Sequence, residues 1–234
     1  MESEKQLVVI TGISGYVGSQ VCKAFLEDGT YKIRGTVRSV NNPKKIDPLK
    51  KAFGDKFEEM ELVEADLMNK ESLIKACEGA KFIVHTASPF PIVEPKKEEE
   101  LIKPAVDGTL AIMEAAKING VKRVVITSSV AAIYKSLDKT KSVFSVADWT
   151  ELKLASAYEK SKTMAEKSAW DFQAQLGEDE KIEIVTVNPG LVLGPNLVTC
   201  QFSSGDVVKK FMMREFPSCP RVQMPVVDVR DVAQ

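Results

Sequence analysis

The stretch that decides the fold is VVITGISGYVG, residues 8–18, where a run of β-branched residues ends in a glycine-rich turn. Apolar residues then recur at helical spacing, at Val17, Val21, Ala24 and Phe25. The pattern predicts a strand, a tight turn and a helix. Such a turn lets backbone N–H groups approach a phosphate, and the helix N-terminus adds favourable dipole charge. The glycines at 12, 15 and 18 differ in spacing from G-x-G-x-x-G, so a plain strand–helix turn stays open at this point.

Composition excludes several classes of protein. The chain has 234 residues, is 44% hydrophobic and carries a formal net charge of −1. We expect no nucleic-acid partner, because no basic patch is interleaved with aromatic residues, and no membrane span or signal peptide. Four scattered cysteines without a C-x-x-C pair indicate free thiols in a reducing cytoplasm. No cluster has metal-ligand spacing, so we predict a cytoplasmic protein without a metal.

Strand and helix patterns alternate regularly along the chain. Runs rich in valine, isoleucine and aromatic residues predict strands over 31–37, 57–64, 82–86, 121–128 and 182–187. Helical patterns between them cover 49–53, 71–77, 101–119 and 157–175. Near-continuous apolar strands separated by helices predict an α/β fold with a doubly wound, Rossmann-like parallel sheet covered on both faces.

The rhythm changes after residue 190. We expect residues 1–190 to form a dinucleotide-binding domain and residues 191–234 to begin a small, incomplete substrate lobe. That lobe should contain a helix over 206–216 and a short returning strand over 222–227. The chain stops just as a capped helix begins after Asp228, which we interpret as the truncation of a longer protein.

A cation follows the second expected strand, where dinucleotide-binding folds usually place an acidic residue that binds the adenosine ribose. Arg38 suits a ribose 2′-phosphate through planar, bidentate hydrogen bonds, and Lys44 and Lys45 follow within reach. Three cations on an exposed loop are the alternative, but this leaves the missing acid unexplained. The sequence therefore favours NADP(H) over NAD as cofactor.

Further contacts with the cofactor are expected at other strand ends. Asp66 closes the third strand, where its carboxylate could bind an adenine amino group or cap the next helix. Small residues after the fourth strand would let ribose and phosphates lie close to the backbone: Thr86, Ala87 and Ser88. His85, the single histidine, fits a structural role better than a catalytic one.

A tyrosine and a lysine point to the chemistry. Tyr158 and Lys162 lie four residues apart on the expected helix 157–175, so they share a face. A nearby ammonium lowers the pKa of a phenol, which makes Tyr158 a candidate proton donor to a carbonyl under reduction. Hydroxyls at the end of the fifth strand could hold the carbonyl oxygen: Thr127, Ser128 and Ser129. The pair alone also suits an exposed helix face, but its position after the glycine turn and these hydroxyls favours catalysis.

Together these segments resemble the extended short-chain dehydrogenase/reductase family. Within it they are most similar to the branch of dihydroflavonol reductases, cinnamoyl-CoA reductases and NADPH-dependent aldehyde (methylglyoxal-type) reductases. The resemblance covers nearly the whole chain and rests on residues 11–18, 36–38, 65–67, 127–129, 158–162, 188–190 with 194–195, and 227–233. It implies that Ser129 binds the carbonyl oxygen, that Tyr158 is the general acid and that Lys162 activates it.

The resemblance also implies the cofactor contacts. Arg38 and Lys45 match the ligands of the 2′-phosphate, and Pro189 with its neighbours would flank the nicotinamide. The full predicted set is Gly12, Ser14, Gly15, Tyr16, Val17, Gly18, Arg38, Lys45, Asp66, Leu67, Thr86, Ala87, Ser88, Thr127, Tyr158, Lys162, Pro189, Gly190, Leu191 and Val192.

The chain departs from this family at three places. Pro104 and Ala105 stand where many relatives carry an asparagine, so proton relay would use water or another group. Ile133 stands where flavonoid reductases are expected to place a polar substrate ligand, and residues 155–159 lack the tyrosine-rich motif of cinnamoyl-CoA reductases. Neither a flavonoid nor a cinnamoyl thioester is therefore assigned. Family members also normally continue further and complete the substrate lobe.

The leading prediction is an NADPH-dependent reductase of a small-molecule aldehyde or ketone, working as a monomer or a homodimer. One alternative is a nucleotide-sugar epimerase or dehydratase, or a hydroxysteroid-type dehydrogenase, on the same scaffold. These enzymes usually prefer NAD, so Arg38 argues against them. The alternative from another class is a non-catalytic NADP-binding sensor, which would tend to lose the catalytic tyrosine.

Overall fold

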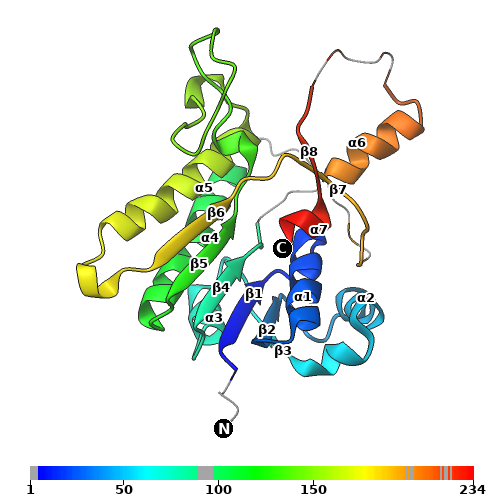
Figure 1. The fold of residues 1–234 in the computed structure, drawn as a ribbon, viewed down its shortest axis with the longest axis vertical. Coiled ribbons are helices and arrows are strands. Elements are labelled where there is room, and N and C mark those ends of the chain that lie inside the picture. The colour runs from blue at the N-terminus through cyan, green and yellow to red at the C-terminus, as the bar shows by residue number, and fades with distance from the viewer. Residues whose placement is uncertain are drawn as a thin grey trace.

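A parallel six-stranded sheet forms the centre of the protein (Figure 1). The computed structural model describes residues 5–88, 97–198, 200, 203–216, 218, 221 and 223–234. The strand order is β3-β2-β1-β4-β5-β6. The bounds are β1 (Leu7–Thr11), β2 (Lys32–Val37), β3 (Met60–Glu64), β4 (Phe82–His85), β5 (Arg123–Thr127) and β6 (Glu183–Val187). This order confirms the predicted doubly wound sheet, and the carboxyl ends of β1 and β4 form its switch point.

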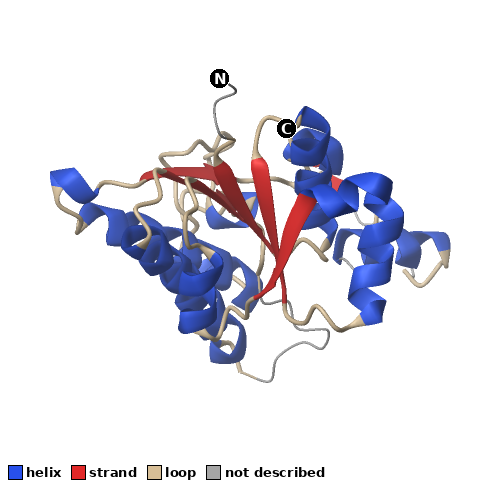
Figure 2. Cartoon of the chain, turned by 90° about the horizontal axis from the view of Figure 1, so that it is seen from below, coloured by secondary structure: helices blue, strands red, loops and turns tan. Residues whose placement is uncertain are grey.

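Helices cover both faces of this sheet (Figure 2). They are α1 (Tyr16–Asp28), α2 (Pro43–Phe53), α3 (Lys70–Ala76), α4 (Glu99–Ile118) and α5 (Ala157–Ala174). Val8 and Ile10 of β1 pack in the core shared with α1 and α2, while Val9 packs in the core shared with α3, α4 and α5. All three side chains are fully buried, which is why β1 has no polar alternation.

Two boundaries on the β2–β3 side differ from the predicted ones. α2 begins at Pro43, earlier than the expected start at 49, because Asn42 caps it and accepts a hydrogen bond from the N–H of Lys44 at 3.1 Å. Proline suits this first position, since its missing N–H has no intrahelical partner to lose. The predicted start of the third strand, at residue 57, was wrong. Gly54–Glu59 is a 3-10 helix, from which Phe57 packs against the core, and β3 begins only at Met60.

A second, two-stranded parallel sheet lies outside the main one and pairs β7 (Leu191–Leu193) with β8 (Val226–Asp228). β7 was not predicted from the sequence. α6 (Ser203–Met212) starts and ends earlier than the predicted helix. β8 begins four residues later than the predicted strand and ends one residue beyond it, and residue 222 lies outside the described residues. The predicted capped helix is present as α7 (Val229–Val232), with Asp228 as its N-cap.

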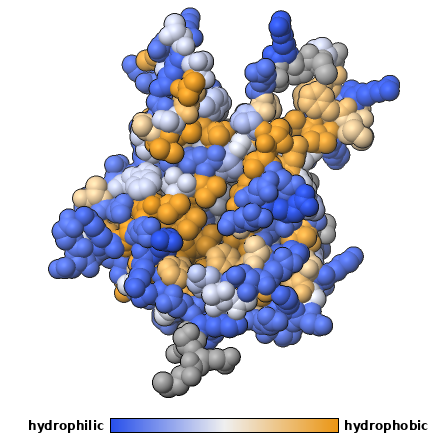
Figure 3. Space-filling model, in the orientation of Figure 1, coloured by the Kyte–Doolittle hydropathy of each residue, from blue (hydrophilic) through white to orange (hydrophobic). Residues whose placement is uncertain are grey.

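The part of the chain around α6 exposes apolar side chains (Figure 3). Phe211 is 42% and Met212 is 81% exposed, and Met213 just after the helix is 63% exposed. This part of the chain therefore buries much less apolar surface than the main sheet. Among the helices that the structure describes, none combines the length and the apolar character needed to cross a membrane.

Candidate active site

The turn between β1 and α1 folds tightly against the end of β4. Gly12 adopts a φ of 71°, and a Cβ added to it would lie 3.0 Å from Cα of Ala87. A Cβ on Gly18 would lie 2.6 Å from Oγ1 of Thr86 and closer still to the carbonyl oxygen of Gly12. Both positions therefore require glycine, one for its left-handed backbone and the other for close approach.

The N-terminus of α1 faces this turn without a side-chain cap. Gly15 is the N-cap residue, and its own N–H donates to the carbonyl oxygen of Gly12 at 2.9 Å. The N–H groups of the first helical turn thus keep their capacity to bind an anion, and the helix dipole favours negative charge there. Ser14, Tyr16 and Val17 lie around this helix start. The bare glycine cradle fits the pyrophosphate of a dinucleotide, and side chains at Gly12 or Gly18 would distort the cradle by pressing on Ala87 or Thr86.

Hydroxyl groups and His85 join the strand ends beside the turn. Oγ1 of Thr11 lies 2.9 Å from Nδ1 of His85 and accepts a hydrogen bond from the N–H of Ala87 at 3.2 Å. Oγ1 of Thr86 donates to the carbonyl oxygen of Thr11 at 2.5 Å. Burial, with a smaller effect of the charge on Lys162, lowers the pKa of His85 to about 3. His85 is therefore a neutral, buried link between β1 and β4, which agrees with the structural role expected for it.

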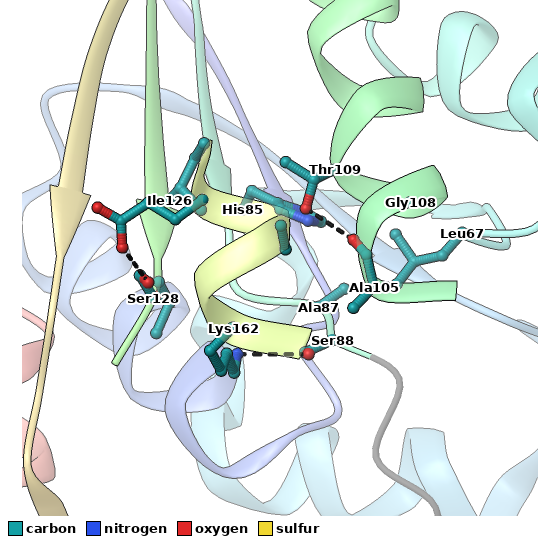
Figure 4. Close-up of a pocket in the computed structure, with 13 residues that line it drawn as sticks. Leu67, His85, Ala87, Ser88, Ala105, Gly108, Thr109, Ile126, Ser128 and Lys162 are labelled. Carbon is teal, nitrogen blue, oxygen red and sulfur yellow. Dashed lines mark hydrogen bonds between the residues drawn. The ribbon is translucent and has the colours of Figure 1, made fainter. Parts of the chain in front are cut away.

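A small cavity of about 20 Å³ lies at the carboxyl ends of β4 and β5 (Figure 4). Five predicted cofactor residues line it: Leu67, Ala87, Ser88, Thr127 and Lys162. Nζ of Lys162 donates a hydrogen bond to Oγ of Ser88 at 3.4 Å. This volume is that of about one water molecule. It is therefore a small pocket of mixed polar and apolar lining beside the site, and it is too small to hold the cofactor.

The three predicted catalytic residues come from two adjacent segments. Ser129 lies two residues after the end of β5 and caps the 3-10 turn Val130–Ala132, while Tyr158 and Lys162 lie near the start of α5. Loss of solvation raises the pKa of the Tyr158 phenol above 10.0, and a hydrogen bond with Ser129 opposes this rise. The expected lowering of this pKa by Lys162 is therefore not what the structure shows. The raised pKa keeps the phenol protonated at neutral pH, which is the form that donates a proton.

A buried carboxylate that was not predicted from the sequence supports the charge on Lys162. Burial lowers the pKa of Lys162 to about 8, and the charge on Glu166 opposes this effect. Glu166 is only 6% exposed, and its Oε2 accepts hydrogen bonds from the hydroxyl of Ser128 and from Nδ2 of Asn188, the latter at 2.8 Å. Asn188 also donates to the carbonyl oxygen of Ser129 at 3.1 Å. The four-residue spacing from Lys162 was the signal that could have identified Glu166.

The segment that follows β6 contacts the turn after Ser129 at one end and α1 at the other. The N–H of Val130 donates to the carbonyl oxygen of Pro189 at 3.0 Å. The hydroxyl of Tyr16 donates to the carbonyl oxygen of Gly194, also at 3.0 Å. Val192 packs with Tyr16 in a small cluster of buried side chains. The structure thus places four predicted cofactor residues between Ser129 and Tyr16: Pro189, Gly190, Leu191 and Val192.

The predicted ligands of the 2′-phosphate lie beyond β2. Arg38 is exposed directly after this strand, and Lys45 is half-buried in the first turn of α2. Asp66 is exposed after β3, and its Oδ1 accepts a hydrogen bond from the N–H of Met68 at 2.9 Å. The alternative role of Asp66 as a helix cap was wrong, because Asn69 caps α3. The carboxylate of Asp66 instead shapes the turn at this strand end.

Within the described ranges, no group of three or more histidine, cysteine, aspartate and glutamate side chains is placed to hold a metal ion. Cys22, Cys77 and Cys200 are free, and Cys219 lies outside the described residues. Burial raises the pKa of both Cys22 and Cys77 to about 12. These two thiols are therefore protonated and act as small buried side chains.

Comparison with known proteins gives a consistent set of relatives. The profile described as the NAD dependent epimerase/dehydratase family matches residues 8–234. A cinnamoyl-CoA reductase of Medicago truncatula is 35% identical over 234 residues, which span 97% of this chain and 70% of the relative. Tetraketide alpha-pyrone reductase 1 of Arabidopsis thaliana is 36% identical over 241 residues, spanning 100% and 72%.

Solved structures with the same fold include two further reductases. Yeast methylglyoxal/isovaleraldehyde reductase, complexed with NADPH, matches with a TM-score of 0.83 and 29% identity over 97% of this chain and 72% of that one. Vestitone reductase from alfalfa (Medicago sativa L.) matches with a TM-score of 0.75 and 29% identity, over 98% of this chain and 71% of that one. These structures share the strand arrangement described above.

Proposed function

Because the chain belongs to the NAD dependent epimerase/dehydratase family, we propose that it is an NADPH-dependent oxidoreductase that reduces an aldehyde or ketone to an alcohol. The observation that carries the proposal is the packing of the 3-10 turn capped by Ser129 against the helix of Tyr158 and Lys162, at the sheet edge where the glycine cradle opens. The similar plant proteins are reductases by name, and the similar yeast reductase is complexed with NADPH. This supports the same class of reaction here.

Two parts of the chain divide the work in this proposal. Residues 1–190 hold the cofactor across the switch point of the main sheet, and residues 191–234 begin the lobe that encloses the substrate. Arg38 and Lys45 bind the 2′-phosphate beyond β2, a strand without an acidic residue. This pair makes NADPH the preferred cofactor.

Tyr158 is the proton donor in the proposed mechanism. Bound NADPH supplies the hydride that reduces the carbonyl carbon. The hydroxyl of Ser129, itself oriented by the N–H of Ala131 at 3.1 Å, holds the carbonyl oxygen beside the phenol. As that oxygen gains negative charge, the phenol of Tyr158 donates its proton to it. The ammonium of Lys162, whose charge Glu166 supports, would hydrogen-bond the nicotinamide ribose of the bound cofactor.

Cofactor binding and turnover together test this proposal. The chain is titrated with NADPH and separately with NADH, following nicotinamide fluorescence, and then mixed with NADPH and a series of small aldehydes and ketones. We expect tighter binding of NADPH than of NADH, and consumption of NADPH with at least one carbonyl compound. Equal binding of both cofactors would contradict the 2′-phosphate site and favour an epimerase. Tight NADPH binding without reduction of any carbonyl would favour a binding-only sensor.

A further inference from the structure

A partly buried ionic cluster joins the segment that carries Ser129 to the helix that carries Tyr158. At its centre is Glu159, the residue next to Tyr158, which is only 6% exposed. Its carboxylate accepts hydrogen bonds from the hydroxyl of Tyr134 and from Nζ of Lys135, the latter at 2.6 Å. Both donors lie just beyond the 3-10 turn that Ser129 caps. The cluster therefore spans the two segments whose relative position sets the catalytic geometry.

The same carboxylate closes the cap of α5. Oε2 of Glu159 accepts hydrogen bonds from the backbone N–H and the hydroxyl of Ser156, at 2.7 and 2.9 Å. In return, Oγ of Ser156 accepts one from the N–H of Glu159 at 3.4 Å. This reciprocal pair is a complete capping box. The helix start is satisfied by Ser156 and Glu159 alone, so the bonds from Tyr134 and Lys135 are not needed to cap it.

Lys135 is also held from its other side. Its Nζ donates to the carbonyl oxygen of Leu154 at 3.0 Å, and its N–H donates to Oγ1 of Thr150 at 3.2 Å. Thr150 is 2% exposed, and its Oγ1 donates to the carbonyl oxygen of Ala131 at 2.8 Å. The chain from Ala131 to Lys135 is thus tied to the residues that precede α5 as well as to α5 itself.

The cluster holds its charges over a wide range of pH. Burial alone would raise the pKa of the Glu159 carboxyl, but hydrogen bonds from Lys135, Tyr134 and Ser156 outweigh this and lower it to about 2. Burial and the contact with Glu159 raise the pKa of Tyr134 to about 12. Glu159 therefore stays ionised and Tyr134 stays neutral near neutral pH, so their hydrogen bond does not depend on pH in that range.

We propose that Glu159 and Lys135 are positioning residues, which hold the hydroxyl of Ser129 at its working distance from that of Tyr158. The inference rests on the proposed function, because the reduction of a carbonyl is what gives this distance its importance. Neither residue donates the proton or holds the substrate. Loosening their contact should therefore slow the proton transfer without weakening the binding of NADPH.

The first test uses substitutions of Lys135, whose side chain is 30% exposed and whose loss leaves the capping box intact. Lys135→Met should lower kcat about 10- to 100-fold, as expected for a small misplacement of catalytic groups, while the Kd for NADPH and the Tm stay near the wild-type values. Lys135→Arg keeps the charge and the reach, so it should restore most of kcat. Full kcat in Lys135→Met would contradict the proposal.

A matched control removes a different ion pair at the start of α5. Glu98 pairs with Lys160 at 2.6 Å, and the Glu98 side chain is 53% exposed. Glu98→Gln should leave kcat within about twofold of wild type, because exposed pairs contribute little. An equal loss of kcat in Glu98→Gln and Lys135→Met would mean that any disturbance of α5 slows the reaction, which would overturn the specific role of Lys135.

The second test does not depend on turnover. The chain has four tyrosines, so NMR titration of ring-labelled tyrosine, assigned with single Tyr→Phe variants, resolves Tyr158. The hydrogen bond with Ser129 lowers the pKa of Tyr158, so Lys135→Met should raise this pKa and Glu98→Gln should leave it unchanged. An unchanged pKa in Lys135→Met would overturn the positioning role. A wild-type chain that reduces no carbonyl would count against the proposed function alone, and this titration would still decide the role of the pair.

Discussion

The carboxylate of Glu166 accepts a hydrogen bond from the hydroxyl of Ser128, the residue directly before Ser129. Glu166 lies one helical turn beyond Lys162, and its charge opposes the effect of burial on the pKa of that lysine. Through Asn188 it also reaches the carbonyl oxygen of Ser129. One buried side chain thus connects the ends of β5 and β6 to the helix that carries the proposed proton donor.

Replacing this carboxylate should change the pH dependence of reduction. Glu166→Gln removes the charge that opposes desolvation, so the pKa of Lys162 should fall below about 8. Since lysine is charged only below its pKa, the alkaline limb of the kcat/KM profile should move to lower pH. Glu178→Gln, at a side chain 85% exposed, is the control and should leave the profile unchanged. An unmoved limb in Glu166→Gln would contradict the coupling.

The phenol of Tyr158 should be essential for turnover and not for cofactor binding. Tyr158→Phe keeps the ring and removes the proton, so kcat should fall about 10²- to 10⁴-fold, the usual contribution of a general acid. The Kd for NADPH, measured by fluorescence, should change little. Tyr31→Phe is the control, because Tyr31 packs edge to face with Phe25 and Phe82 away from the site. Substantial activity in Tyr158→Phe would refute the mechanism.

The glycine cradle should not accept a methyl group at Gly18. Gly18→Ala would press against Thr86 and the backbone of Gly12, so we expect a loss of stability of about 1–3 kcal/mol and weaker NADPH binding. Gly177→Ala is the matched control, since nothing lies within 4 Å of its added Cβ, and it should be neutral within about 1 kcal/mol. Thermal unfolding and NADPH titration measure both effects. Equal behaviour of the two variants would contradict the close approach.

Arg38 should decide between the two nicotinamide cofactors. A lost charge-assisted hydrogen bond is worth about 1.5–3 kcal/mol, so Arg38→Ala should weaken NADPH binding about 10- to 150-fold. NADH lacks the 2′-phosphate, and its Kd should stay the same. Arg123→Ala removes a cation from the first residue of β5. This is the amino end of the strand, whereas the cofactor site lies at the carboxyl ends, so neither cofactor should be affected. A parallel loss of both cofactors in Arg38→Ala would rule out the 2′-phosphate contact.

His85 should make the protein less stable in mild acid. Its pKa is about 3 in the folded protein and 6.5 when unperturbed, so the unfolded chain binds the extra proton more readily. The stability that neutral His85 contributes is therefore complete above pH 6.5 and is lost as the pH falls toward 3. His85→Asn keeps an amide for Thr11 and removes the titration. Its Tm should fall less than that of wild type between pH 7.5 and pH 5.5, and equal falls would contradict this cause.

Local signals along the chain were enough to predict most of the fold. The apolar runs of β4 and β5 and the cap Asp228 each depend on nearby residues, and the structure has them where they were expected. α2 was predicted too short because Pro48 obscured the cap at Asn42, which is itself a local signal. β7 could not be found in this way. Its pairing with β8 depends on Gly190, whose missing side chain lets the carbonyl oxygen of Pro225 approach and accept a hydrogen bond from the N–H of Leu191.

In the candidate site, too, some features follow from local sequence and others depend on contacts between distant residues. The glycine turn and the shared face of Tyr158 and Lys162 follow from spacing alone. The contacts of Glu166 with Ser128 and of Glu159 with Lys135 join residues 38 and 24 positions apart. Such contacts depend on how the end of β5 meets α5, which no window of sequence contains. Their effects on pKa therefore also required the three-dimensional structure.

The place of β1 between β2 and β4 has a consequence for the newly made chain. Thr11 and His85, bonded across β1 and β4, are 74 positions apart. A ribosome that adds roughly 5–20 residues per second needs about 4–15 s to make that interval. Throughout it, Val9 of β1 lacks the neighbours from β4 and α4 that bury it in the finished protein. During this interval the apolar side chain of Val9 is therefore open to contact with other unfinished polypeptides.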